Sequence, residues 1–205
     1  MTKKLEKLLV CSHNQGKLKE FKEILQKLSI ELVTPNELPG LPDPVEDGDT
    51  FLANAQIKAR AAFAHTGLPS IGDDSGLVVP ALNGDPGLMS ARYSGVKKGE
   101  GRDAANRRKL MDNVAALPLE ERKGYFICTM VLCLGEGQEE SFVGRCHGEI
   151  ILEERGENGF GYDPIFLLPE YGKTFAEIPS AEKHKISHRG LALEAFQKWL
   201  RETQN

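Results

Sequence analysis

Residues 8–33, which read LLVCSHNQGKLKEFKEILQKLSIELV, decide the fold class. Residues 8–11 are an apolar run of the kind that forms a buried strand. Residues 16–28 carry apolar side chains on one helical face: Leu18, Phe21, Leu25 and Leu28. Residues 30–33 return to a strand pattern. A strand, a helix and a second strand in this order predict an α/β fold.

The rest of the chain continues this alternation. We predict helices from Asp49 or Thr50 to about Ala64, over 102–114, and over 188–202, the last burying Leu191, Ala195, Phe196 and Trp199. Strands are expected at 70–79, 124–134 and 139–151, the first interrupted by the polar residues 73–76 and the last two joined by a hairpin turn at 135–137. Prolines 35, 39, 42 and 44 mark one loop, and Gly-rich loops are expected at 83–101 and 155–164. This order favours a mixed sheet over a purely parallel one.

Length, composition and charge narrow the class of protein. The 205 residues suit one large domain or two small ones, and 40% hydrophobic residues argue against a disordered chain. We find neither a run of about 18 apolar residues nor a signal-peptide core after the basic residues 1–7, so a soluble cytoplasmic protein is expected. The net charge of −4 argues against sequence-independent binding of DNA or RNA and leaves a local basic site possible. The cysteines at 11, 128, 133 and 146 lack zinc-ligand spacing and are expected to be buried free thiols.

Polar residues follow the first strand directly. The stretch 12–17, SHNQGK, lies between a strand and a helix, where backbone N–H groups at the helix N-terminus suit a phosphate. Ser12 and Asn14 add hydrogen bonds and Lys17 adds a positive charge. The alternative is an ordinary capped helix start.

Two further clusters carry carboxylates and a lysine. Asn54 and Lys58 share a helix face after Glu46, where a solvated face is the alternative. Asp73 and Asp74 lie between apolar segments, where adjacent carboxylates are costly unless they are paired. A divalent cation, Mg²⁺ above all, would pair them, and an exposed turn is the alternative.

Two segments near the C-terminus complete the set. In residues 156–164, GENGFGYDP, glycines leave space around Phe160 for stacking on a base, and Asp163 could hold a sugar, a base edge or the loop. A hydrophobic plug is the alternative. Residues 183–189, KHKISHR, form a basic cluster at the start of the last helix, which could also be a solvated helix start. The five signals together suit a nucleoside triphosphate.

The chain resembles the inosine triphosphate pyrophosphatase family, also called Ham1-like, in its bacterial form. The resemblance covers about residues 7–200 and rests on six segments in the family's order: SHNQGK (12–17), VEDGDTF (45–51), DDSGL (73–77), PGLMSARYSG (86–95), GFGYDP (159–164) and ISHR (186–189). Ser12 stands where Thr is frequent and keeps the hydroxyl. Ala53 stands where the family often has Glu, which removes one carboxylate near the expected metal site.

The resemblance implies a role for each matched position. Asp74 is implied as the proton acceptor and, with Glu46 and Asp73, as a ligand of Mg²⁺. The implied substrate-binding residues are Ser12, His13, Asn14, Gln15, Gly16, Lys17, Ser75, Phe160, Gly161, Tyr162, Asp163, Lys183, His188 and Arg189. Lys58 joins them as a cation expected to stabilise the leaving pyrophosphate. Among these, residues 12–17 bind the triphosphate, and 160–163 with Lys183, His188 and Arg189 form the base and sugar pocket.

The resemblance also implies a fold and an activity. The fold is a single domain over 1–205, an elongated mixed sheet with flanking helices and two lobes around a substrate cleft, usually as a homodimer. The activity is Mg²⁺-dependent hydrolysis of ITP, dITP and XTP to the monophosphate and pyrophosphate, which removes them from the nucleotide pool. We expect no nucleic-acid or membrane partner.

Three competing functions stay open from the sequence. A pyrophosphatase of pyrimidine or modified nucleotides would use the same phosphate-binding residues. A nucleotide sensor would bind without hydrolysis, which the carboxylates Glu46, Asp73 and Asp74 argue against. A structural or RNA-binding protein is the most distant, because the cations lie in separate motifs with no aromatic–basic stripe. Neither the preference among ITP, dITP and XTP, the rejection of guanine, the role of His13 nor a dimer interface follows from the sequence.

Overall fold

The computed structural model describes residues 5–97, 99 and 101–203, so the first part of the basic N-terminus and two positions of the predicted loop 83–101 lie outside the described residues. The chain divides into two compact units. Unit 1 comprises residues 1–74, 128–144 and 188–205, and unit 2 comprises residues 75–127 and 145–187. None of the described helices is both long enough and apolar enough to cross a membrane.

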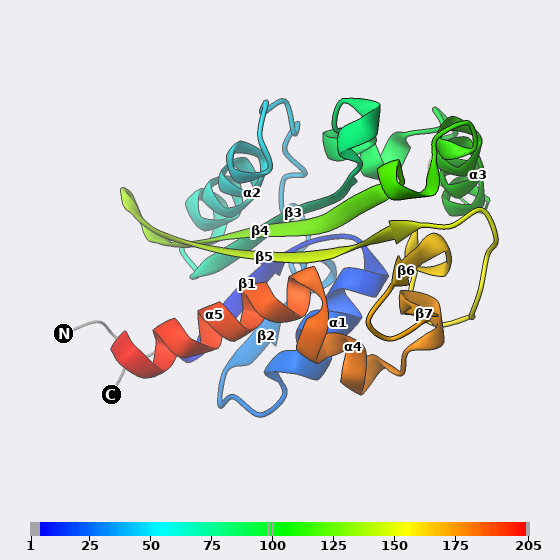
Figure 1. Ribbon diagram of the computed structural model, residues 1–205. Helices are drawn as coiled ribbons and strands as arrows, with labels where there is room; N and C mark the ends of the chain where they lie inside the picture. The colour runs from blue at the N-terminus through cyan, green and yellow to red at the C-terminus, as the bar shows by residue number, and fades with distance from the viewer. Residues whose placement is uncertain (1–4, 98, 100, 204–205) are drawn as a thin grey trace. The chain divides into compact units, whose positions relative to one another are not determined.

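Seven strands and five α-helices are described (Figure 1). The strands are β1 (Lys7–Cys11), β2 (Glu31–Val33), β3 (Ser70–Val78), β4 (Lys123–Gly135), β5 (Gln138–Ile150), β6 (Phe166–Leu168) and β7 (Lys173–Thr174). The helices are α1 (Gln15–Leu25), α2 (Phe51–Thr66), α3 (Arg102–Val114), α4 (Ser180–Ile186) and α5 (His188–Thr203).

The strands pair in the order β2-β1-β3-β4-β5-β6-β7. β1 is parallel to both β2 and β3, with Leu9 opposite Val33 and Ser70. β6 is antiparallel to β5 and to β7. The predicted mixed sheet with flanking helices is therefore confirmed.

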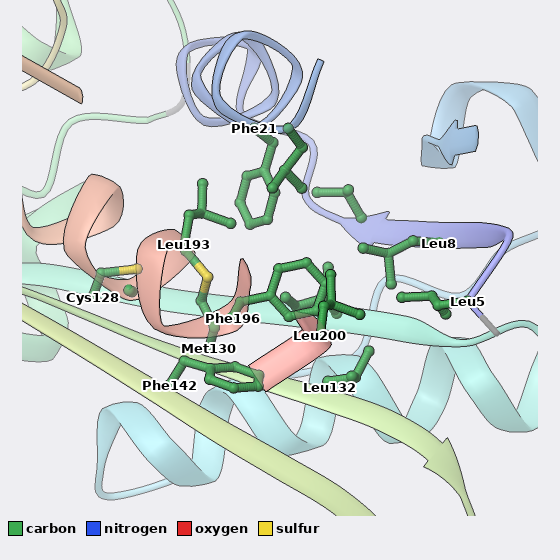
Figure 2. Close-up of a cluster of buried hydrophobic side chains, with 14 of the residues drawn as sticks. Leu5, Leu8, Phe21, Cys128, Met130, Leu132, Phe142, Leu193, Phe196 and Leu200 are labelled. Carbon is green, nitrogen blue, oxygen red and sulfur yellow. The ribbon is translucent and has the colours of Figure 1, made fainter. Parts of the chain in front are cut away.

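Helices cover both faces of the sheet in unit 1. On one face, α1 and α5 pack over β1, β3 and β4 with a core that includes Phe21, Met130 and Phe196 (Figure 2). The same two helices are joined by a hydrogen bond from Gln197 to the Ile24 carbonyl oxygen. On the other face, alanines of α2 pack against Val131 of β4 and its neighbour Cys133. Alternate residues of β4 thus enter different cores, which explains its continuous apolar run.

Unit 2 has a separate core. Aromatic rings dominate it, and Phe126, Phe166 and Phe175 stack or tilt against one another with centroids 4.6–5.9 Å apart. Side chains of α3 and of the loop after β5 complete this core, among them Leu110 and Tyr162. The core anchors the Gly-rich loop 155–164.

Most predicted elements are confirmed. The helix 102–114 coincides with α3, and Thr50 caps α2 by accepting a hydrogen bond from the Ala53 N–H. The four cysteines are free and buried as expected. α1 ends at Leu25, before the predicted Leu28.

Two expectations are wrong in whole or in part, and three short elements were not predicted. β3 runs without interruption through residues 73–76, because Asp73 is paired with cations inside the fold and its carboxylate does not need solvent. α5 buries the face carrying Ala192, Leu193, Phe196 and Leu200, whereas Leu191, Ala195 and Trp199 are only half-buried. The elements β6, β7 and α4 were not predicted, since they are too short to show a period.

Candidate functional site

The turn between β1 and α1 is closed by its own side chains. The Asn14 side-chain oxygen accepts a hydrogen bond from the Lys17 N–H at 3.1 Å and caps α1. The Ser12 hydroxyl oxygen accepts from the Asn14 N–H at 3.2 Å. His13 is exposed, with Nε2 4.0 Å from an oxygen of Asp43. The capped helix start is confirmed, and phosphate binding by residues 12–17 stays a prediction.

Asp73 is the centre of a buried ion cluster in unit 1. One carboxylate oxygen lies 2.6 Å from Nζ of Lys17, and the other accepts from Nε and Nη2 of Arg189 at 3.3 and 3.2 Å. The Cys128 thiol donates to the same second oxygen at 3.3 Å, and Arg189 also pairs with Glu20. Asp73 is 2% exposed and Arg189 is 1% exposed. The cluster joins β3, α1, α5 and β4.

The charges in this cluster reinforce one another. Burial by itself raises the pKa of Asp73, but Lys17, Arg189 and Lys58 outweigh it and hold that pKa below its ordinary range. Burial also lowers the pKa of Arg189, yet Asp73 and Glu20 raise it above its usual value. Both groups are therefore charged at neutral pH. The metal-ligand role predicted for Asp73 and the base contact predicted for Arg189 stay predictions.

Asp74 lies in a second, more open cluster of unit 1. Its Oδ2 accepts a hydrogen bond from Nδ2 of Asn54 at 3.1 Å, and its Oδ1 lies 3.6 Å from Nζ of Lys58. The Lys58 ammonium donates to Oε2 of Glu46 at 2.9 Å. The structure therefore brings together three residues that the sequence analysis placed in the site, Glu46, Lys58 and Asp74.

The neighbouring charges shift the pKa values of this second cluster. Burial raises the pKa of Asp74 above its ordinary value, although Lys58, Lys17 and the bond from Asn54 act against the rise. Burial lowers the pKa of Lys58, but Asp74, Asp73 and Glu46 outweigh it and raise that pKa. A carboxylate with a raised pKa beside an ammonium is suited to accept a proton.

Unit 2 holds the predicted aromatic loop. Oδ2 of Asp163 accepts from the Phe160 N–H at 2.9 Å and from Nζ of Lys183 at 2.7 Å. The Lys183 ammonium lies 5.3 Å from the centre of the Phe160 ring. Gly159 has φ +77°, and a Cβ there would lie 2.0 Å from the Asp163 carboxylate, so only glycine allows this closure. Asp163 thus holds the loop, one of the roles left open by the sequence.

Two side chains of helix α3 form hydrogen bonds with the backbone of the same loop. The Gly161 N–H donates to Oδ2 of Asp103 at 3.1 Å, and the Gly161 carbonyl oxygen accepts from Nη1 of Arg107 at 2.9 Å. Tyr162 is buried and donates through its hydroxyl to the Ser90 carbonyl oxygen at 2.8 Å. Tyr162 therefore serves the core of unit 2.

Ser75 and His188 are each adjacent in the sequence to a residue of the two carboxylate clusters. Ser75 follows Asp74 on β3 and is half-buried. His188 begins α5, is buried, and precedes Arg189. The substrate contacts predicted for both residues stay predictions.

Sequence reasoning missed several residues of these clusters: Glu20, Cys128, Asp103 and Arg107. It noted Asn54 only as a neighbour of Lys58. Glu20 could have been found as a carboxylate on the apolar face of a helix, one turn after Lys17. Asp103 and Arg107 carry opposite charges at an i, i+4 spacing. Nothing in the sequence marks Cys128.

The carboxylates of unit 1 suit a cation that is also coordinated by substrate phosphates and water. Within residues 5–97, 99 and 101–203, no three His, Cys, Asp or Glu side chains come together as a metal-holding group. Glu46 and Asp74 nevertheless flank one ammonium, Lys58. Mg²⁺ is commonly held by one or two carboxylates together with substrate phosphates and water. Glu46 and Asp74 fit that pattern, and Asp73, enclosed by cations, does not.

The model of the Ham1 family matches residues 8–199, and the chain belongs to that family. It is 47% identical over 190 residues to a dITP/XTP pyrophosphatase from Mannheimia succiniciproducens, a match that covers 92% of this chain and 94% of the relative. It is 46% identical to the dITP/XTP pyrophosphatase of Haemophilus influenzae, with 93% and 97% of the chains covered.

Solved structures agree with this family. A HAM1 protein from Coxiella burnetii superposes with a TM-score of 0.87 at 41% identity, covering 97% of this chain and all of that one. The Staphylococcus aureus Ham1 protein superposes with a TM-score of 0.84 at 38% identity, with 96% and 98% covered.

Proposed function

We propose that this protein is a nucleoside triphosphate pyrophosphatase that hydrolyses non-canonical purine nucleotides, ITP, dITP and XTP, to the monophosphate and pyrophosphate. The observation that carries the proposal is the cluster in which Lys58 lies between Glu46 and Asp74. It supplies a proton acceptor, a cation and metal ligands in one place. The activity printed for relatives at 46–47% identity supports the same chemistry.

Asp74 is the proposed general base. It takes a proton from a water molecule whose oxygen attacks the α-phosphorus. The bond from that phosphorus to the bridging oxygen breaks, and pyrophosphate leaves. General-base catalysis contributes typically 10²–10⁴-fold, and the raised pKa of Asp74 favours this role.

Charge on the phosphates is met by the cations of unit 1. Lys58 and Lys17 stabilise the negative charge on the leaving pyrophosphate, and the turn 12–17 offers backbone N–H groups to it. Glu46 and Asp74 would hold Mg²⁺, which neutralises charge on the phosphates when bound. Asp73 keeps Lys17 and Arg189 in place.

The base is proposed to meet the aromatic loop of unit 2. Phe160 stacks on it, while Asp163 and Lys183 hold the loop in shape. A 6-oxo group accepts hydrogen bonds, whereas the 6-amino group of adenine would oppose donor to donor, a mismatch that can discriminate strongly. His188 and Arg189 are proposed base contacts on the ground of the family resemblance alone.

A cytoplasmic location and a homodimer belong to the same proposal, the first expected from the sequence pattern and the second from the family resemblance. Light scattering coupled to gel filtration measures the oligomeric state. A mass of one chain, 22.6 kDa, would contradict the dimer.

A substrate panel tests the activity. We expect the wild type to release pyrophosphate from ITP, dITP and XTP with Mg²⁺, far more slowly from ATP and GTP, and not at all with EDTA. Asp74→Asn should lower kcat by about 10³-fold while circular dichroism stays native. Binding of dITP without pyrophosphate release would point to a sensor, and faster release from pyrimidine nucleotides would reassign the substrate.

A further inference from the structure

Asn54 is a buried polar residue to which none of the roles above applies. It lies in the first turn of α2 and is 3% exposed. A primary amide at such burial is costly unless its hydrogen bonds are made. Asn54 makes them to two groups of unit 1, the loop before α2 and the carboxylate of Asp74.

The bond to the loop fixes which way the amide points. The Gly48 N–H donates to Oδ1 of Asn54 at 2.9 Å. Because a backbone N–H can only donate, the amide oxygen must face Gly48, and the NH₂ group must face Asp74. The loop also sits directly on the helix, since a Cβ on Gly48 would lie 2.8 Å from Oδ1 of Asn54 and 2.7 Å from Cβ of Ala53.

The bond to Asp74 controls the plane of its carboxylate. Asn54 donates to Oδ2 at 3.1 Å, while the ammonium of Lys58 faces Oδ1 at 3.6 Å. Asn54 and Lys58 are four residues apart on one helix, so their side chains lie on the same face. One rigid helix thus contacts both oxygens of Asp74, one through a neutral donor and one through a cation.

We propose that Asn54 is a positioning residue, which holds the Asp74 carboxylate in the orientation needed to accept a proton from the attacking water. The inference rests on the proposed function of Asp74. It predicts an effect on turnover more than on substrate binding, because misplacement of a reacting group by about 1 Å can cost 10²-fold in rate.

The chain offers variants that separate this role from simple stability. Asn54→Asp keeps an oxygen for the Gly48 N–H and removes the donor to Asp74. Asn54→Ala removes both bonds. Thr50→Ala removes the cap of the same helix, a bond to the Ala53 N–H at 3.0 Å, without touching Asp74, and is the matched control.

The experiment measures kcat and KM for dITP with Mg²⁺, together with the thermal midpoint, for the wild type and each variant. We expect Asn54→Asp and Asn54→Ala to lower kcat at least tenfold with KM within about threefold of wild type. Thr50→Ala should lower the midpoint by a few degrees and keep kcat. In the Asp74→Asn background, Asn54→Ala should change the residual rate by less than twofold, because the two residues act as a unit.

Each other result overturns a specific statement. If the wild type releases no pyrophosphate, the proposed function fails and this inference fails with it. If the wild type is active and either Asn54 variant keeps kcat within twofold, the positioning role is wrong while the proposed function stands. A loss of kcat in Thr50→Ala as large as in the Asn54 variants, or a further tenfold loss in the double variant, would show that Asn54 acts only through helix stability.

Discussion

Each of the two units buries a carboxylate against a cation, but the partners of the two carboxylates come from different kinds of segment. In unit 1, Asp73 lies on β3 and its partners come from α1, α5 and β4, all regular elements. In unit 2, Asp163 binds Lys183 and the backbone of its own Gly-rich loop. Asp73 therefore joins four regular elements of the fold, whereas Asp163 ties one loop to α4.

The difference separates stability from local shape. A buried charge that joins helices and strands is part of the folded state, and removing it leaves several cations without compensation. A buried charge that closes a loop affects that loop first, because the core behind it is apolar and packs independently. Substitutions around Asp73 should therefore change mainly the free energy of unfolding, whereas substitutions around Asp163 should also change KM.

The largest effect on stability is expected for Asp73→Asn. Loss of the charge leaves Lys17 and Arg189 undercompensated, and we expect the free energy of unfolding to fall by about 3 kcal/mol. Urea denaturation at pH 7 measures this. Asp112→Asn, which breaks an exposed i, i+4 pair on α3, is the control and should cost less than about 0.5 kcal/mol. Equal losses in the two variants would remove the special status of the buried cluster.

The same variant carries a pH test. The folded-state pKa of Asp73 lies below its ordinary value of 3.8. Its stabilisation is therefore complete above the unfolded-state pKa and is lost as the pH falls toward the folded-state pKa. The stability gap between wild type and Asp73→Asn should narrow between pH 6 and pH 3. A gap that stays constant over that range would contradict the ion pairing.

For Asp163→Asn we expect a smaller loss of stability together with a rise in KM. The neutral amide keeps an oxygen for the Phe160 N–H but no longer neutralises Lys183, which is 4% exposed. We expect a loss of about 2 kcal/mol in stability and a rise in KM for dITP of about tenfold as the loop loosens. If KM stays at the wild-type value, Asp163 serves the core of unit 2 rather than the site.

The smallest effect on stability is expected for Phe160→Ala, because the ring is only half-buried. Stacking of a base on an aromatic ring is worth about 1–3 kcal/mol, so KM for dITP should rise roughly tenfold while kcat changes little. Steady-state kinetics and urea denaturation measure the two effects. A large loss of stability with unchanged KM would support the alternative that Phe160 is a hydrophobic plug.

The helices, the long strands and the positions of the polar motifs could be predicted from the sequence. Periodicity is a local property, so α2, α3 and the β4–β5 hairpin follow from residues close together in the chain. β6 and β7 could not be predicted because runs of two or three residues show no period. The continuity of β3 could not be predicted for another reason: two carboxylates in a strand indicate a break as long as the cations that pair with them are unknown.

The sequence by itself determined the mixed α/β architecture of this protein and singled out Glu46, Lys58 and Asp74 as candidate site residues. Only the tertiary structure decided their partners. Arg189 meets Asp73 across 116 positions of the chain and Glu20 across 169, and Asn54 turns its amide toward Asp74 because Gly48 takes its oxygen. Such pairings depend on which elements pack together, and local sequence patterns hold no record of that.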